Sequence, residues 1–416
     1  MPAPVKVGLS SGNNRLAMSV PMAQANPTHV SVPKTHYLPP TAGQSSSAWT
    51  TSGAFLDYTL PQSLGVLDKL TLRLEVSQTV AAGQLAPPVP FWVQQVEVYI
   101  GGSQIEVIYP NELFNEVVGF KTQEALDTVG PYLLSRYNDS SGDTQRTIPV
   151  NPASGSTFYY LPVPNCLSTC HLYVAGVNED VRFRIYFPPS MFPSTTTLKS
   201  AVLVIEEECG SMFEKGRWEE AHRDGVVYNT IVRQRQNQTI TKSGTSANTV
   251  ELTGLSGSTA GLVVYAGPPV IPGTGTQSNI ETGQTVPVNQ LLSQRYEIST
   301  SLELDDAMGA KRTEELRTDE LSSFTWFSHV GTNFSDRFAT YLIPFSYCFR
   351  TPVEDGANAG SIVMKGNDRL VVRGNAVSSG NINATETWNL SVVNYSYQAL
   401  VFKNKKLTNV IRKISN

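Results

Sequence analysis

The sequence predicts an all-β protein built from two successive halves, and three observations support this. Short runs of alternating apolar and polar residues recur along most of the 416-residue chain. The 31 Gly and 26 Pro residues are spread along it, as many turns between short strands require. Charged residues make up only 16% of the chain, which favours a protein that buries surface against copies of itself.

The first half is expected over residues 51–210. Leu70, Leu72 and Leu74 alternate with polar residues, as in a strand with one buried face. A hairpin follows, in which Gly101 and Gly102 provide the turn, and residues 110–120 then change to helical spacing. Further strands are expected at residues 158–161, 171–177, 181–187 and 201–208. The total of about eight strands is that of one jelly roll.

A polar stretch between Gly210 and Gly225 predicts a short linking helix, so residues 211–225 form the expected linker. The second jelly roll is expected over residues 226–402. No strict sequence repeat joins the halves, so an internal duplication would be visible only in the structure. The ends are predicted to be an extended N-terminal arm over residues 1–50, rich in Pro, Ser, Thr, Asn and Ala, and a basic C-terminal tail over residues 403–416.

The charge of the ends differs from that of the body. A formal net charge of −4 and a pI near 5.8 exclude a generally basic nucleic-acid coat. The terminal segments, however, carry cations and no acidic residue, which indicates either solvated tails or two ends that face one anionic layer, genome or membrane. The candidate contact residues are Lys6, Arg15, Lys34, Lys403, Lys405, Lys406, Arg412 and Lys413.

The sequence offers little catalytic chemistry. Cys166, Cys170 and His171 form a CxxxCH run that has no second pair of zinc-type ligands. Glu206 and Glu208 share a strand face, but a solvated strand end explains them more simply. The hydrolase, metalloprotease and nucleotide-binding motifs are absent. We therefore expect no catalytic residue, no metal and no cofactor.

The order of the strand units resembles the double jelly-roll major capsid proteins of tailless icosahedral DNA viruses, a group that includes virophages, polinton-like viruses, large DNA viruses and membrane-containing phages. The first half carries VEVYIGGSQIEV before a helix and RIYFPPSMFPSTTTLKSAVLVIEEE as its last two strands. The second carries YLIPFSYCFRTPVEDGANAGSIVMKGNDRLVV and the closing strand LSVVNYSYQALVFKNKKL. The resemblance covers residues 54–402.

This resemblance implies a structural protein of the virion. It implies a homotrimer that forms a pseudo-hexameric capsomer, which tiles an icosahedral shell around a DNA genome with both termini on the inner side. The implied partners are neighbouring capsomers, minor capsid and penton proteins, and an internal membrane or the genome. Because no signal peptide is evident, we expect synthesis in the host cytoplasm without secretion. Two alternatives stay open: a two-jelly-roll glycan-binding or peptide N-glycosidase-like protein, and a minor capsid or spike protein.

Overall fold

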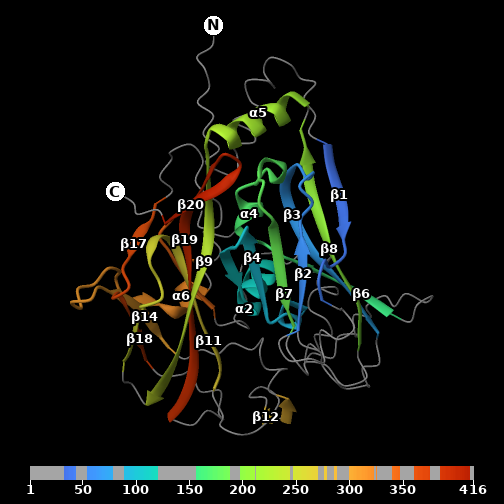
Figure 1. Cartoon of the computed structure of the whole chain (residues 1–416). Helices are drawn as coiled ribbons and strands as arrows, with labels where there is room; N and C mark the ends of the chain where they lie inside the picture. The colour runs from blue at the N-terminus through green and yellow to red at the C-terminus, as the bar shows by residue number, and fades with distance from the viewer. Residues whose placement is uncertain are drawn as a thin grey trace.

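The fold is seen in a computed structural model (Figure 1). It describes residues 32–43, 54–77, 89–119, 156–187, 197–210, 212–243, 247–269, 276–278, 285–287, 299–322, 325, 340–346, 360–374 and 385–412. Antiparallel strands make up most of these segments, and short helices lie between them. None of the helices within these ranges is long and apolar enough to cross a membrane.

The first half forms one eight-stranded jelly roll. Its strands are β1 (Val32–Leu38), β2 (Phe55–Thr59), β3 (Val66–Ser77), β4 (Gln95–Ile100), β5 (Ser103–Ile108), β6 (Ser156–Pro162), β7 (Val181–Tyr186) and β8 (Thr197–Cys209). Sheet A has the order β1-β8-β3-β6, and sheet B has the order β2-β7-β4-β5. In Figure 1 the strands of sheet A lie on the right flank of the molecule, away from the second half.

The second half repeats this arrangement with additional strands. Its strands are β9 (Val226–Ser243), β10 (Asn248–Glu251), β11 (Gly257–Pro269), β12 (Thr276–Ser278), β13 (Thr285–Pro287), β14 (Ser301–Asp305), β15 (Leu316–Arg317), β16 (Thr340–Pro344), β17 (Ile362–Met364), β18 (Arg369–Arg373), β19 (Thr385–Lys403) and β20 (Lys406–Arg412). Sheet C contains β9-β19-β11-β16 together with β17 and β20, and sheet D has the order β10-β18-β14-β15. A separate ribbon joins β12 and β13.

The two halves share one strand order. With β12, β13, β17 and β20 set aside, each half places its first, eighth, third and sixth strands in one sheet and its second, seventh, fourth and fifth in the other. The predicted all-β fold of two consecutive eight-stranded jelly rolls is therefore confirmed. The internal duplication, which the sequence does not show, appears in the connectivity of the strands.

Helices occur at the connections between strands. They are the short 3₁₀ turn η2 (Val89–Trp92), α2 (Pro110–Phe114) with the π-helical turn η3 (Asn115–Gly119), α4 (Cys166–Thr169), the 3₁₀ turn η4 (Val174–Gly176), α5 (Met212–Asp224) and α6 (Thr318–Ser322). Pro110 starts α2, where its missing N–H costs nothing. At α4, the Asn165 side chain accepts hydrogen bonds from the N–H groups of Leu167 and Ser168.

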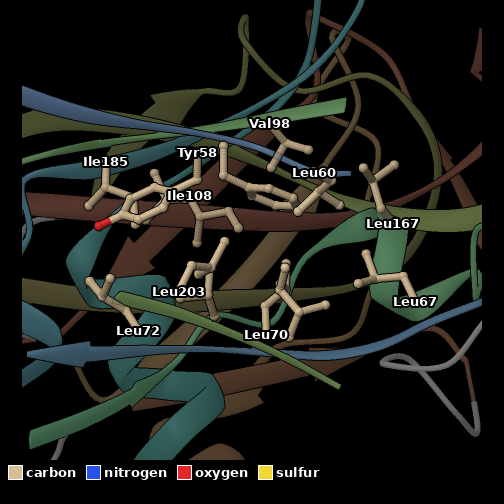
Figure 2. Packing of buried hydrophobic residues seen from close by; sticks show 14 of the residues in the cluster. Tyr58, Leu60, Leu67, Leu70, Leu72, Val98, Ile108, Leu167, Ile185 and Leu203 are labelled. Carbon is tan, nitrogen blue, oxygen red and sulfur yellow. The ribbon is translucent and has the colours of Figure 1, made fainter. Parts of the chain in front are cut away.

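The core of the first jelly roll follows from the alternation that predicts the strands. Leu70 and Leu72 of β3 and Leu203 of β8 point from sheet A toward Val98 and Ile185 of sheet B (Figure 2). All five side chains are buried. Because successive strand residues point to opposite faces, the residues between them, such as Arg73, lie on the outer face of sheet A.

Three sequence expectations need correction. Residues 32–38 of the expected arm form β1, which pairs with β8 as the edge strand of sheet A. Residues 406–412 of the expected tail form β20, which pairs with β19. Residues 171–177 form a turn that contains η4 rather than a strand. β1 forms because the distant strand β8 supplies its partner, whereas β20 forms as a local hairpin with β19. The limits of the two jelly rolls at residues 51, 210, 226 and 402 stay predictions.

The expected linking helix is α5, which separates the end of sheet A from the start of sheet C. A linker between two separately cored domains predicts few contacts between the halves. The hydrophobic core of the first jelly roll instead continues into the second through Trp218, Tyr228, Leu400 and Phe402. The two sandwiches are thus joined by a buried apolar junction and not only by a linker.

Candidate assembly surfaces

The end of the molecule that carries α5 holds the two jelly rolls together (Figure 1). His222 of α5 is fully buried, and its Nδ1 lies 2.8 Å from the carbonyl oxygen of Trp218, so this nitrogen carries the proton and donates. Its Nε2 therefore accepts from the Tyr228 hydroxyl at 3.1 Å. Burial, together with the charge of nearby Lys405, lowers the pKa of His222 to about 4, although the hydrogen bond to the Trp218 carbonyl raises it.

The space for this ring comes from the first jelly roll. A Cβ on Gly176 would lie 2.6 Å from the His222 ring, so a glycine is needed for the close approach. The ring of Tyr173 stacks at a tilt on Trp218, with centroids 5.0 Å apart, and Phe402 of β19 lies 5.8 Å from His222. Residues of both halves thus enclose one aromatic cluster.

The turn between β19 and β20 closes the junction. Asn404 and Lys405 have φ values of 52° and 61°, as a two-residue hairpin turn of the primed type requires. Their N–H groups donate to the carbonyls of Arg223 and His222, at 3.1 and 3.0 Å, and so satisfy two free carbonyls at the end of α5. The Lys405 carbonyl in turn accepts from the N–H of Asn178 in the first half, at 2.8 Å.

A buried ion cluster joins the halves at a second place. The Arg233 guanidinium of β9 lies 2.8 Å from Glu106 of β5 and 3.0 Å from Glu116 of η3. Glu106 also accepts from the backbone N–H groups of Cys166 and Arg233. The guanidinium carbon is 5.8 Å from the ring centroid of Tyr395 on sheet C. Because both acids belong to the first half and the cation to the second, the cluster fixes their relative position.

Glu112 lies beside this cluster in α2. Its side chain is fully buried, and it accepts a hydrogen bond from the N–H of Tyr109 at 2.9 Å. Desolvation raises its pKa to about 7, although the charge of Arg235 and the Tyr109 N–H oppose this effect. One of its carboxyl oxygens has no hydrogen-bond partner. The junction therefore contains an acid that titrates near neutral pH.

The basic residues that the sequence predicts as contacts fall into three groups. Lys403, Lys405 and Lys406 lie in or beside the hairpin turn under α5, and Lys405 makes an ion pair with Glu219 at 3.6 Å. Lys34 is exposed on β1 opposite Glu207, at the edge of sheet A. Arg412 ends β20 opposite Gln398. Lys6, Arg15 and Lys413 lie outside the described residues.

The start of β1 and the final hairpin share the α5 end of the molecule. Val32 pairs with Cys209, which ends the strand that leads into α5, and the 404–405 turn binds the last residues of α5. The same end carries the acids of α5: Glu214, Glu219, Glu220 and Asp224. Its charge is thus mixed in sign, and the contact of these cations with an anionic layer stays a prediction.

The residues weighed for chemistry have separate partners in the structure. Cys166 and Cys170 are buried, and desolvation raises the pKa of both thiols. His171 instead faces Asp68 at 3.9 Å. Glu206 makes an ion pair with Lys69 at 3.3 Å. Within the described ranges, three or more His, Cys, Asp or Glu side chains nowhere gather as metal ligands.

Sequence reasoning missed an aromatic surface on the outer face of sheet A. Arg73 lies between the rings of Tyr37 and Phe158, whose centroids are 5.3 and 5.6 Å from its guanidinium carbon. Tyr37 is 63% exposed and Tyr160 is 41% exposed. We call this surface the flank face, and it consists of Tyr37, Arg73, Phe158, Tyr160, Val202 and Val204. The alternation of Phe158 and Tyr160 with buried Tyr159 and Leu161 is its signal in the sequence.

These features, two jelly rolls of one strand order with a shared buried junction, define a double jelly-roll protein. Three solved structures with similar folds come from viruses. PBCV-1 VP54, fitted into a reconstruction of the virophage Sputnik, matches at TM-score 0.68 and 11% identity, over 93% of this chain and 98% of that one. The Faustovirus major capsid protein matches at TM-score 0.59 and 7% identity, over 91% and 92% of the two chains. A chain of Sulfolobus Turreted Icosahedral Virus matches at TM-score 0.50 and 13% identity, over 88% and 90%.

No family model matches the chain, and neither does any curated protein sequence. Because the identities are 13% or less, the structural matches establish the fold alone. The chain has the double jelly-roll fold of the viral capsid proteins that it resembles.

Proposed function

We propose that this chain is a major capsid protein. Three copies associate into a pseudo-hexameric capsomer, and capsomers tile an icosahedral shell around a DNA genome. The observation that carries the proposal is the duplicated strand order of the two halves. A chain with two similar sandwiches side by side supplies two of six equivalent positions, so three chains complete a hexagonal tile.

The junction between the halves supports this role. A tile keeps its shape only if the two sandwiches of each chain hold a fixed angle. The aromatic cluster around His222 and the ion cluster around Arg233 are buried contacts that resist such rotation. The protein would act through geometry, in the virion and without catalysis, after synthesis in the host cytoplasm.

The α5 end would face the inside of the shell. The start of β1 and the turn of the final hairpin lie there, whereas β20 runs from this turn away from α5 to Arg412. Exposed Lys403 and Lys406 would contribute roughly 1 kcal/mol each beside an anionic internal membrane, with a comparable salt-dependent attraction to the genome. Neighbouring capsomers, minor capsid proteins and penton proteins would be the protein partners.

Light scattering after size-exclusion chromatography tests the proposal. At micromolar concentration the purified chain should elute as a closed trimer, with a mass three times the 45.4 kDa of one chain. A stable monomer under these conditions would contradict the capsomer.

A further inference from the structure

The internal duplication places a short acidic helix at the same point of each half. α2 follows β5, the fifth strand of the first jelly roll, and α6 follows β15, the fifth strand of the second. The two helices share a local pattern, Asn111-Glu112-Leu113 and Asp319-Glu320-Leu321. Leu113 and Leu321 are both buried, so each helix packs on its own sandwich through this leucine, while Glu112 is buried and Glu320 is exposed.

Within the chain, the α2 segment contacts the outer face of sheet C. Glu116 of the adjoining η3 turn binds Arg233, whose guanidinium lies near the ring of Tyr395 on that face. Tyr109, which precedes α2, lies 4.7 Å from the guanidinium carbon of Arg235. The middle of this face is covered, since Tyr395 and Tyr265 are each only 1% exposed.

The equivalent face in the first jelly roll is the flank face, the outer side of sheet A. It has the same kind of composition, with aromatic rings around an arginine, but it is open. Arg73 is held by Tyr37 and Phe158, its Nε has no hydrogen-bond partner, and none of the described acids lies within ion-pair distance of it. Arg73 lies on β3, whose counterpart in the covered sheet is β11 and not the β9 that carries Arg233. The two arginines therefore share an outer face and aromatic neighbours rather than one position, and Arg73 lacks the carboxylates that Arg233 has.

We propose that the flank face binds the α6 segment of a second copy of this chain. Glu320, which is exposed on α6, would supply the carboxylate that Arg73 lacks, while Tyr37 and Tyr160 pack against the helix. The contact joins different surfaces of two copies, so it is head-to-tail, and the two similar sandwiches of each chain supply the repeated rotation that closes three copies into a ring. Each chain already contains one such contact between its own halves, so a ring of three copies has six contacts, three within chains and three between chains. This inference rests on the proposed capsomer and names the surfaces that form it.

Charge reversal across the contact tests the pairing. Arg73→Glu and Glu320→Arg should each weaken trimer formation about 30-fold or more, because a buried charge would lose its partner and meet a like charge. The double variant Arg73→Glu/Glu320→Arg should restore the trimer measured by light scattering. Arg223→Glu reverses an exposed arginine on α5, away from the flank face, and should leave the trimer unchanged.

A second variant separates the loss of association from a folding defect caused by substitution of the partly buried Arg73. Tyr160 is exposed enough for Tyr160→Glu to fold, which circular dichroism would verify, and this variant should also be monomeric. If the wild-type chain is trimeric and Tyr160→Glu and Glu320→Arg remain so, the assignment of the surfaces is overturned while the proposed function stands. A monomeric wild-type chain would overturn both.

Discussion

Replacing Arg233 with Met should strongly destabilise the junction between the jelly rolls. The Arg233 side chain is 6% exposed, and it is the shared cation of Glu106 and Glu116, which are 0% and 9% exposed. Removal of one partner from a buried ion pair costs roughly 3–5 kcal/mol, because a charge is left uncompensated. Glu106 keeps two backbone N–H donors, so we expect the lower end, about 3 kcal/mol.

Urea unfolding at pH 7 and one fixed protein concentration would measure this loss by circular dichroism. The matched control is Arg317→Met, which removes an exposed ion pair with Asp319, 68% and 62% exposed, and should change the free energy of unfolding little. Adding Glu116→Gln to Arg233→Met should recover part of the stability. An Arg233→Met variant no less stable than the Arg317→Met control would refute the account of the junction.

Three further predictions concern pH and the chain end. His222 has a folded-state pKa of about 4, below its unfolded value near 6.5, so the free energy of unfolding should fall by roughly 3 kcal/mol as the pH drops from 6.5 to 4. In His222→Gln, the free energy of unfolding from urea titrations should change less over this pH range. Glu112 has a folded-state pKa of about 7, above its unfolded value, so the stability that the protonated side chain contributes is lost as the pH rises from 4.5 to 7. Glu112→Gln should therefore be more stable than the wild type at pH 8. Deleting residues 1–31 should leave trimers intact and impair shell assembly in a particle-yield assay, whereas deleting residues 1–45 also removes β1 and should lower the unfolding midpoint.

The strands that could be predicted from the sequence are those whose alternation is local. β3, the β4–β5 hairpin and β7 each show their buried face within a few residues, and the two glycines beside α5 indicate the link between the halves. β1 could not be predicted in this way. It contains Pro33, and its strand conformation depends on pairing with β8, about 170 residues away.

The assembly surfaces were harder to predict than the fold, for the same reason. Arg233 and Glu106 are 127 residues apart in the sequence, and nothing local indicates that a basic residue of one half meets an acid of the other. The terminal cations, in contrast, stand out by composition alone. The structure shows that several lie among acids at the α5 end, which composition does not reveal.

Electron microscopy of assembled particles tests the central claim most directly. The account predicts capsomers of three chains with six β-sandwiches in a hexagonal outline, with the α5 end of each chain toward the particle interior and α6 of one copy against sheet A of the next. Capsomers of any other copy number, or shells in which the α5 ends face outward, would contradict it.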